Sequence, residues 1–192
     1  MDKKILLKHL MGKIQCWING IQHSGEIYIG KNVHIVNGKK IRLGRACQIR
    51  PECDLYALDM IEIGNRCDIG TRNRIVGNVV IEDSVLLGPD NYISFTDHCY
   101  QNINVPIMDQ GAYIPDRNGH KELKIGGGSW IGTHVAIIGD VHIGKHCIIG
   151  ANSVVLKDIP DFCVACGIPA EIIKKYDVIT QRWVGTNAKR KV

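Results

Sequence analysis

The sequence lacks any hydrophobic run long enough to cross a membrane, and we therefore expect no membrane-spanning helix. The short apolar run Ile5–Leu10 is interrupted by Lys8 and His9, so it does not have the character of a secretory signal. Aromatic residues are also scarce, at 6% of the chain, whereas glycine occurs 21 times. This balance is more typical of a thin, repetitive β structure than of a helical bundle.

Charge of one sign is not in strong excess either. The 24 basic and 19 acidic residues leave a net charge of +5, which is too small to indicate a nucleic-acid partner, and we expect none. The length of 192 residues suits a single domain with a sizeable core. Because no export signal is evident, we expect a cytoplasmic protein whose eight cysteines are reduced thiols.

A six-residue repeat is the dominant pattern of the sequence, and it is clearest over residues 125–160. Branched aliphatic residues, which we call anchors, occupy every sixth position there: Ile125, Ile131, Ile137, Ile143, Ile149 and Val155. Small or aliphatic residues stand two positions before the later anchors: Ser129, Val135, Val141, Cys147 and Ser153. A period of six fits neither an α-helix nor an alternating strand, and a fixed period predicts a repeat architecture.

Anchors also recur earlier in the chain, in three runs offset by two residues: 29–41, 43–61 and 63–93. We predict an all-β solenoid with three hexads in each coil of about 18 residues, and coils stacked ~4.8 Å apart. The anchors would fill the interior, and glycine after an anchor would allow a tight corner. Cys47, Cys53 and Cys67 fall on the small inward position, and irregular hexads at 36–40 and 56–60 predict small loops or bulges.

One long insertion interrupts the repeat. Residues 96–122 are polar and irregular, and an insertion of this length in a compact domain is usually functional or disordered. The predicted organisation is an N-terminal amphipathic cap (1–24), a β-helix domain (25–170) that carries loop 96–122, and a basic C-terminal tail (171–192).

The two ends of the chain depart from the repeat. The first 24 residues predict a short amphipathic helix in which lysines alternate with aliphatic residues: Lys3, Lys4, Lys8 and Lys13. This helix would cap the open end of the solenoid. Peripheral contact with an anionic membrane surface is a second, compatible interpretation. After Pro160 we expect a short strand or helix on the last coil, and a loose end at 189–192.

Four motifs, in this order, resemble the hexapeptide-repeat acyltransferases, specifically their O-acetyltransferase branch. They are the hexads themselves, Pro89–His98, Ser129–Gly132, and Asn152–Pro160 followed by Gly167–Ala170. The segment His98–Gly111 is further similar to enzymes that decorate bacterial surface polysaccharides. The resemblance implies a left-handed parallel β-helix, a homotrimer with active sites at subunit interfaces, and acetyl-CoA as acyl donor.

The implied reaction is acetyl transfer to a hydroxyl of a sugar or surface-polysaccharide precursor. An acetyltransferase for another small acceptor (a drug, an amino sugar or serine) is an alternative. A non-catalytic β-helix that serves as an assembly module is a second alternative, because fold does not imply function.

The resemblance places a catalytic histidine at His98, and an imidazole suits a general base because its pKa of about 6.5 lies near working pH. Asp97 and Tyr100 are candidates to orient this imidazole or to contact acceptor hydroxyls. Asp97 also falls on the inward small position, so it could turn a corner instead. Asn91 and Tyr92 are further acceptor-site candidates.

The resemblance also implies where CoA lies: along Trp130, Gly132, Thr133, Ala151, Leu156 and Lys157. Backbone amides there would bind the pantetheine arm and the thioester oxygen, and the glycines at 126–128 would let that arm approach. Lys157, Lys174 and Lys175 are candidates for the CoA phosphates. Glu171 stands where relatives often have a basic residue, so Lys174 is expected to substitute for it.

We expect no metal. Cys163 and Cys166 form a lone C-x-x-C without the second pair that a zinc site needs. Zinc-binding carbonic anhydrases share the implied fold and use three histidines. However, His134, His142 and His146 lack the flanking signatures of that family, and the hexad register points them outward.

Overall fold

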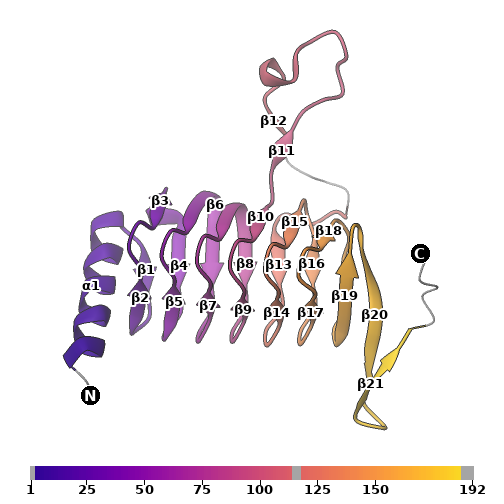
Figure 1. Ribbon diagram of the computed structural model, residues 1–192. Coiled ribbons are helices and arrows are strands. Elements are labelled where there is room, and N and C mark those ends of the chain that lie inside the picture. The colour runs from indigo at the N-terminus through magenta and orange to yellow at the C-terminus, as the bar shows by residue number, and fades with distance from the viewer. Residues whose placement is uncertain (1–2, 114–117, 187–192) are drawn as a thin grey trace.

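The chain folds into a parallel β-helix with an α-helix across one end and a long loop projecting from one side (Figure 1). The computed structural model describes residues 3–113 and 118–186, with the backbone alone at residues 3–5 and 113. The predicted all-β solenoid with a short N-terminal helix is confirmed. The loose end expected at 189–192 lies outside the described residues.

The coils contribute their strands to three rows, which we call A, B and C in chain order. Row A contains β1 (Gln22–His23), β4 (Ile41–Leu43), β13 (Leu123–Ile125), β16 (His142–Ile143) and the second halves of β6 (Asp54–Ile63) and β8 (Arg74–Ile81). Row B contains β2 (Ile27–Ile29), β5 (Cys47–Ile49), β7 (Asp68–Ile69), β9 (Leu86–Leu87), β14 (Trp130–Ile131), β17 (Ile148–Ile149) and β19 (Cys163–Gly167). Row C contains β3 (His34–Val36), the first halves of β6 (Asp54–Ile63) and β8 (Arg74–Ile81), β10 (Tyr92–Ser94), β15 (Ala136–Ile138) and β18 (Val154–Val155).

Strands of successive coils pair in parallel and in register. Ile49 pairs with Ile69, twenty residues later, whereas Ile69 pairs with Leu87, eighteen residues later. The extra residues of the early coils are absorbed by the 3₁₀ turn η1 (Gly38–Lys40) and by a register shift within β6. The loops or bulges predicted at the irregular hexads are therefore confirmed.

The anchors point into the solenoid and form one continuous core. Every predicted anchor is buried except Ile35, which is half-buried against the same core. The small positions are buried as predicted, including the cysteines Cys47, Cys53, Cys67 and Cys147. Burial raises the pKa of the Cys53 and Cys147 thiols to about 11, so both stay neutral and pack as small hydrophobes.

The glycines that follow the anchors have a different role from the one predicted. The left-handed backbone of a corner falls two residues later, for example at His134 (φ 54°) and His146 (φ 52°). Gly132 and Gly144 are required for a steric reason instead. A Cβ at Gly132 would lie 2.7 Å from the backbone nitrogen of Ala151 in the next coil, and one at Gly144 would lie 2.4 Å from that of Asp161. The close stacking of coils therefore excludes side chains there.

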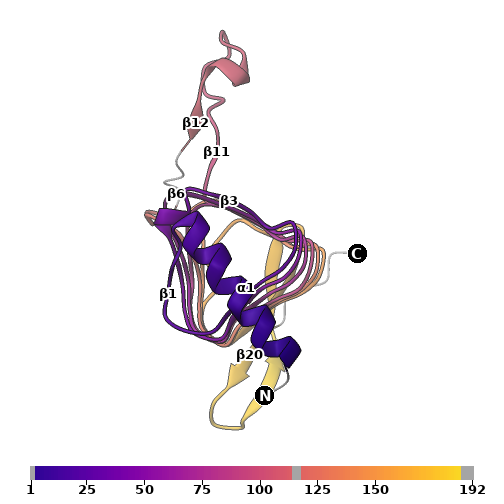
Figure 2. The same cartoon turned by 90° about the vertical axis from the view of Figure 1, so that its left-hand side faces the viewer.

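The N-terminal helix α1 (Lys3–Asn19) lies across the open end of the solenoid (Figure 2). It packs on β2 through buried Gly12 and Cys16, and it covers the edges of the first coil. The predicted capping helix is thus confirmed. Within the described part of the chain, no helix is both long enough and apolar enough to cross a membrane.

The opposite end is covered by antiparallel strands. β20 (Ala170–Asp177) pairs with β19 of the last coil, and β21 (Arg182–Gly185) pairs with β20. Trp183 contacts Tyr176 edge-to-face, with ring centroids 5.4 Å apart. The short strand expected after the repeat is confirmed, and it extends into a hairpin through much of the predicted tail.

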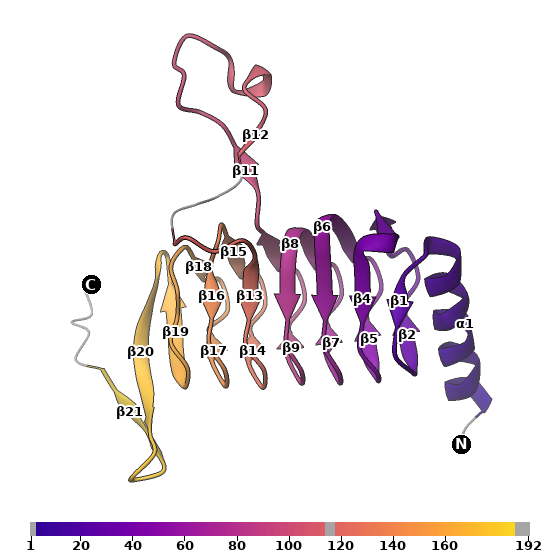
Figure 3. The ribbon, with the colours of Figure 1, turned by 180° about the vertical axis from the view of Figure 1, so that it is seen from behind.

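The insertion leaves the solenoid at the corner between rows C and A and projects away from it (Figure 3). Its stem is a two-stranded antiparallel hairpin, β11 (Asp97–His98) with β12 (Ala112–Tyr113). A 3₁₀ turn, η2 (Ile107–Asp109), lies near its tip. The solenoid resumes at β13 with its hydrogen-bonding register intact, because β13 pairs with both β8 and β16.

Candidate functional site

The candidate base His98 lies on the hairpin stem of the insertion. Its side chain is exposed, and its backbone N–H donates to Oδ1 of Asp97 at 2.8 Å. The stem is closed by the Cys99 N–H, which donates to the carbonyl of Gly111. His98 is therefore presented to solvent from an ordered pair of strands.

The inward position considered for Asp97 is wrong. Phe95 is the last buried residue before the insertion, so the chain has left the solenoid when it reaches Asp97. The hexad register no longer applies to a strand that lies outside the coils. The Asp97 carboxylate is exposed and accepts the backbone N–H of its neighbour.

Tyr100 follows the stem and is more than half exposed. The hairpin beyond it is braced by Gln110, whose side-chain amide donates to the carbonyls of Asn102 (2.8 Å) and Val105 (2.7 Å). Tyr100 and His98 are thus displayed on the same projecting loop. Neither belongs to the wall of the solenoid.

The return arm of the loop, residues 118–122, is held against the solenoid by a cluster of polar groups. Nε2 of His120 lies 2.9 Å from Oδ2 of Asp158, and the His120 ring stacks on that of His142 with centroids 3.5 Å apart. Nε2 of His142 lies 3.4 Å from Oε1 of Glu122. Fully buried Asp140 accepts the backbone N–H of Asn118 at 2.6 Å.

This cluster was not anticipated from the sequence. Its residues come from two successive coils and the end of the insertion, and no local motif joins them. The one available signal was that His120 and Glu122 belong to the insertion, while His142 and Asp158 occupy outward hexad positions. Their meeting depends on the path by which the loop returns.

The two acceptor-site candidates of row C have different environments. Tyr92 on β10 faces outward between Arg74 and Ala136 of the neighbouring coils. Asn91 is 2% exposed, and its amide donates to the carbonyl of Gly88 while its Oδ1 accepts the N–H of Val135. Its polar atoms are therefore used inside the corner. Asn91 therefore has a structural role in this corner, and its assignment to the acceptor site stays a prediction.

The residues expected to contact CoA form a surface that we call the donor wall. Trp130, Gly132, Thr133 and Ala151 lie at and beside the corner between rows B and C, in two adjacent coils. The Trp130 side chain is half exposed and Ala151 is exposed. The Thr133 hydroxyl donates to the carbonyl of Pro89 at 2.9 Å, which ties this corner to the one that precedes Tyr92.

Row B also aligns the candidate phosphate ligand with the tryptophan. Trp130 pairs with Ile148, Ile148 with Val164, and Val164 with Lys174 on β20. Three strand spacings of ~4.8 Å place Lys174 about 14 Å from Trp130 along the solenoid. Lys174 is exposed in this line, whereas Glu171 pairs with Cys166 near the end of the strand.

Leu156 and Lys157 lie at the next corner, after β18. Lys157 is exposed and directly precedes Asp158, the residue that holds His120 of the return arm. The donor wall therefore reaches the base of the insertion, but the hairpin that carries His98 projects away from it (Figures 1 and 3). Within one chain, the candidate base and most of the donor wall are separate surfaces.

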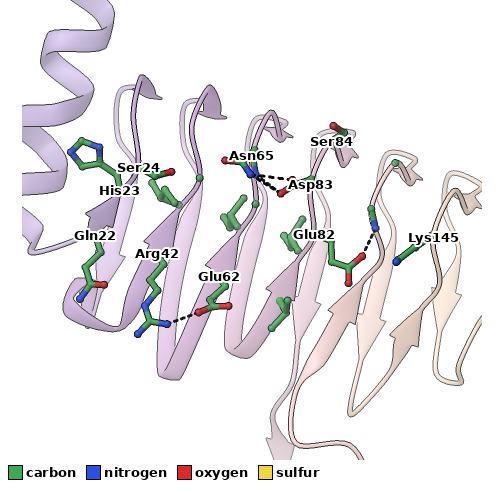
Figure 4. Close-up of a pocket in the computed structure, with 18 of the residues that line it drawn as sticks. Gln22, His23, Ser24, Arg42, Glu62, Asn65, Glu82, Asp83, Ser84 and Lys145 are labelled. Atoms are coloured by element: carbon green, nitrogen blue, oxygen red, sulfur yellow. Dashed lines mark hydrogen bonds and ion pairs between the residues drawn. The ribbon is translucent and has the colours of Figure 1, made fainter.

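A large groove lies elsewhere, along the corner between rows A and B (Figure 4). Its volume is about 1020 Å³, and its carboxylates Glu62 and Glu82 are both ion-paired. Nη1 of Arg42 lies 2.7 Å from Glu62, and Nζ of Lys124 lies 2.7 Å from Glu82. The bond from Lys124 holds the pKa of Glu82 below its usual value. This groove contains none of the candidate site residues.

The glycine run at 126–128 belongs to this groove and corner. Space for a side chain at Gly128 is already taken, because a Cβ there would lie 2.6 Å from the His146 ring. Gly127 donates its N–H to Glu82 at 2.9 Å. Coil packing thus accounts for these glycines without the pantetheine contact that we expected.

Among the described residues, no group of three His, Cys, Asp or Glu side chains could hold a metal ion. The three histidines considered for zinc are dispersed. His134 lies at the corner between rows B and C, His142 in row A, and His146 at the corner between rows A and B.

Comparisons with known proteins agree with this architecture. Residues 123–157 match the family model described as bacterial transferase hexapeptide (six repeats). The chain is 30% identical over 173 residues to galactoside O-acetyltransferase of Escherichia coli, a match that covers 88% of the chain and 79% of that relative. It is 34% identical over 108 residues to a putative lipopolysaccharide biosynthesis O-acetyltransferase of the same organism (53% and 55%).

A probable acetyltransferase of Mycobacterium tuberculosis is 30% identical over 182 residues, and the match covers 83% of the chain but only 57% of that longer relative. Among solved structures, the N-acyltransferase AntD from Bacillus cereus, in complex with dTDP and 3-hydroxybutyryl-CoA, superposes with a TM-score of 0.70 at 19% identity, covering 85% of the chain and 87% of AntD. PerB from Caulobacter crescentus, in complex with CoA and GDP-perosamine, gives 0.54 at 19% (86% and 65%). At these identities the structures establish the fold.

Proposed function

Because the chain belongs to the hexapeptide-repeat acetyltransferases, we propose that it is an acetyl-CoA-dependent O-acetyltransferase acting on a sugar or surface-polysaccharide precursor. Two relatives support oxygen as the accepting atom, since both are named O-acetyltransferases. One is named for galactosides and the other for lipopolysaccharide biosynthesis. The observation that carries the proposal is the exposed His98 on the ordered stem of the insertion.

His98 is the general base in this proposal. It accepts the proton of the acceptor hydroxyl as that oxygen bonds to the carbonyl carbon of the acetyl thioester. The tetrahedral intermediate then expels the CoA thiolate, and the imidazolium of His98 donates its proton to that thiolate. Backbone N–H groups of the donor wall would stabilise the oxyanion.

The donor wall offers a path for CoA. Trp130 and the exposed corner at Ala151 would flank the pantetheine arm, and Lys174, in line with Trp130, would bind a phosphate. Lys157 would lie at the end nearest the insertion. Tyr92 on the wall of row C and Tyr100 on the loop are the more exposed acceptor-site candidates, beside Asp97 on the hairpin stem and buried Asn91.

We further propose that the active site forms between subunits of a homotrimer. The hairpin carries His98 away from the chain's own donor wall, so a neighbouring copy is a natural partner for it. The free thiols of the eight cysteines suit a reducing compartment such as the cytoplasm.

The test is a thiol-release assay with acetyl-CoA and a panel of sugars, amino sugars and glycan repeat units. His98→Ala should lower kcat/KM about 10²- to 10⁴-fold, because it removes the general base. The matched control is His34→Ala, an exposed histidine at the other end of the solenoid, which should retain full turnover.

Donor binding should survive the loss of the base. At a hundred times its dissociation constant, acetyl-CoA should stabilise both wild type and His98→Ala by about 2.7 kcal/mol. Unchanged turnover in His98→Ala would remove its assigned role. Transfer to amino sugars alone would replace O- by N-acetylation, and an absence of any acetyl-CoA shift would favour a non-catalytic assembly module.

A further inference from the structure

The N-terminal helix exposes its apolar side. Seven large hydrophobic side chains of α1 are between 47% and 83% exposed: Leu6, Leu7, Leu10, Met11, Ile14, Trp17 and Ile18. Given the periodicity of an α-helix, Leu10, Ile14 and Trp17 fall on the side opposite Gly12 and Cys16. They form a continuous strip along the outer surface of the molecule, which we call the outer face of α1.

Capping the solenoid does not require this outer face. The helix contacts the first coil through small residues, because the backbones approach closely: a Cβ at Gly12 would lie 2.3 Å from the carbonyl oxygen of Ile27. Cys16 is fully buried in the same contact. A helix that served only as a cap would keep polar residues on its outer side.

The charge of the helix indicates what covers the outer face. The sequence of α1 contains four lysines and no acidic residue. Lys13 is exposed beside the apolar strip, and Lys8, also exposed, extends over the Tyr28 ring of the first coil, with its Nζ 5.6 Å from the ring centroid. A basic helix with Leu, Ile and Trp on one side is the pattern of an element that lies in the surface of an anionic bilayer.

We propose that the outer face of α1 docks on the surface of an anionic lipid bilayer. The helix lies flat across the end of the solenoid, so this end can approach a plane (Figure 2). The insertion projects from the side of the solenoid and would remain free (Figure 1). The proposal rests on α1 alone and does not depend on the proposed acetyl transfer.

A second copy of the chain is a poorer occupant of this face. Two α1 helices in contact would bring together eight lysines, four from each chain, with no acidic residue in either helix. Like charges at such short range disfavour association, whereas anionic headgroups attract the same lysines.

The test is sedimentation of the full chain with vesicles. Wild type should pellet with vesicles of phosphatidylcholine and phosphatidylglycerol, and much less with phosphatidylcholine alone. High salt and Lys13→Glu should each weaken binding, because both reduce the electrostatic attraction. The double variant Leu10→Ser/Trp17→Ser should bind at least about tenfold more weakly, since it removes two apolar side chains that would enter the bilayer surface.

The matched control is Val178→Ser/Ile179→Ser. These exposed apolar residues lie in the turn between β20 and β21, at the opposite end of the molecule, and their loss should leave vesicle binding unchanged. Wild type that stays in the supernatant, or Leu10→Ser/Trp17→Ser that pellets equally, would overturn the proposal. So would light scattering without vesicles that shows a larger assembly for wild type than for Leu10→Ser/Trp17→Ser, because a second copy would then occupy the face.

Discussion

Buried backbone groups at the corner between rows B and C are satisfied by two stacked asparagines. Asn73 donates its side-chain amide to the carbonyls of Gly70 (2.7 Å) and Gly88 (2.9 Å), and its Oδ1 accepts the Asn91 N–H. Asn91 repeats this arrangement in the next coil, where it binds Val135. Because both side chains are buried, the corner depends on them for partners that water cannot supply.

We predict that Asn91→Ala lowers the free energy of unfolding by about 1–3 kcal/mol, because it leaves the buried N–H of Val135 without its acceptor and removes one of the two amide donors to the Gly88 carbonyl. Urea denaturation measures this. The control Asn104→Ala, an exposed asparagine of the loop, should change stability by less than about 0.5 kcal/mol. An unaltered stability of Asn91→Ala, together with a raised KM for the acceptor, would support the acceptor-site assignment of Asn91 over the structural role.

The residues predicted correctly are those fixed by the repeat. Anchors such as Ile131 and small positions such as Cys147 follow from the period, because stacked coils impose the same environment at each repeat. Asp97 could not be placed in this way, since the register ends where the chain leaves the coil after Phe95. The burial of Asn91 could have been predicted, because Asn91 stands two positions before the anchor Ile93, at the small inward position.

At the scale of elements, the insertion is anchored differently at its two ends. It leaves row C directly from β10, whereas its return arm is held by the contacts of His120, His142 and Asp140. The arm and the donor wall share one corner, because Asp158 follows Lys157. The position of the hairpin, and hence of His98, therefore depends on these side-chain contacts.

We predict that His120→Ala frees the return arm without unfolding the solenoid. Loss of its bond to Asp158 and of its stacking on His142 should cost about 1 kcal/mol locally. Cleavage within loop 96–122 during limited proteolysis should then become about fivefold faster, while the denaturation midpoint changes little. The control is His23→Ala, which changes an exposed histidine near the N-terminal end of the solenoid. An equal cleavage rate in both variants would show that the contacts of His120 do not hold the return arm.

The existence of α1 was predictable from its sequence, but its orientation was not. Amphipathic patterning normally places the apolar side inward, whereas here Gly12 and Cys16 face the coil. The helix backbone lies close to the backbone of the first coil, so only small residues of α1 fit between them. The C-terminal hairpin was equally hard to predict in full, because the hexad period stops before β20.

On the scale of the whole molecule, one chain displays the two halves of the proposed site on separate surfaces. His98 stands on a hairpin that projects from the corner between rows C and A, whereas Trp130 and Ala151 lie at the corner between rows B and C. A site that needs both must be completed by a second copy or by a large movement of the loop. These two possibilities give different results when inactive variants are mixed.

We predict that His98→Ala and Ala151→Trp complement each other. Each alone should be inactive, the first for want of a base and the second because the indole blocks the donor wall at an exposed corner. If each site combines the base of one subunit with the wall of its neighbour, co-expression in equal amounts should restore about a quarter of wild-type turnover. If each site lies within one chain, the mixture should stay inactive.

A second mixture tests independently whether each active site is shared between subunits or lies within one chain. The chain carrying both substitutions, His98→Ala/Ala151→Trp, is co-expressed with wild type in equal amounts. Sites shared between subunits would then be intact in about a quarter of cases, whereas sites within one chain would be intact in about half. Thiol release from acetyl-CoA, scaled to purified protein, distinguishes these outcomes. Half activity here, together with no recovery in the first mixture, would assign the complete site to a single chain.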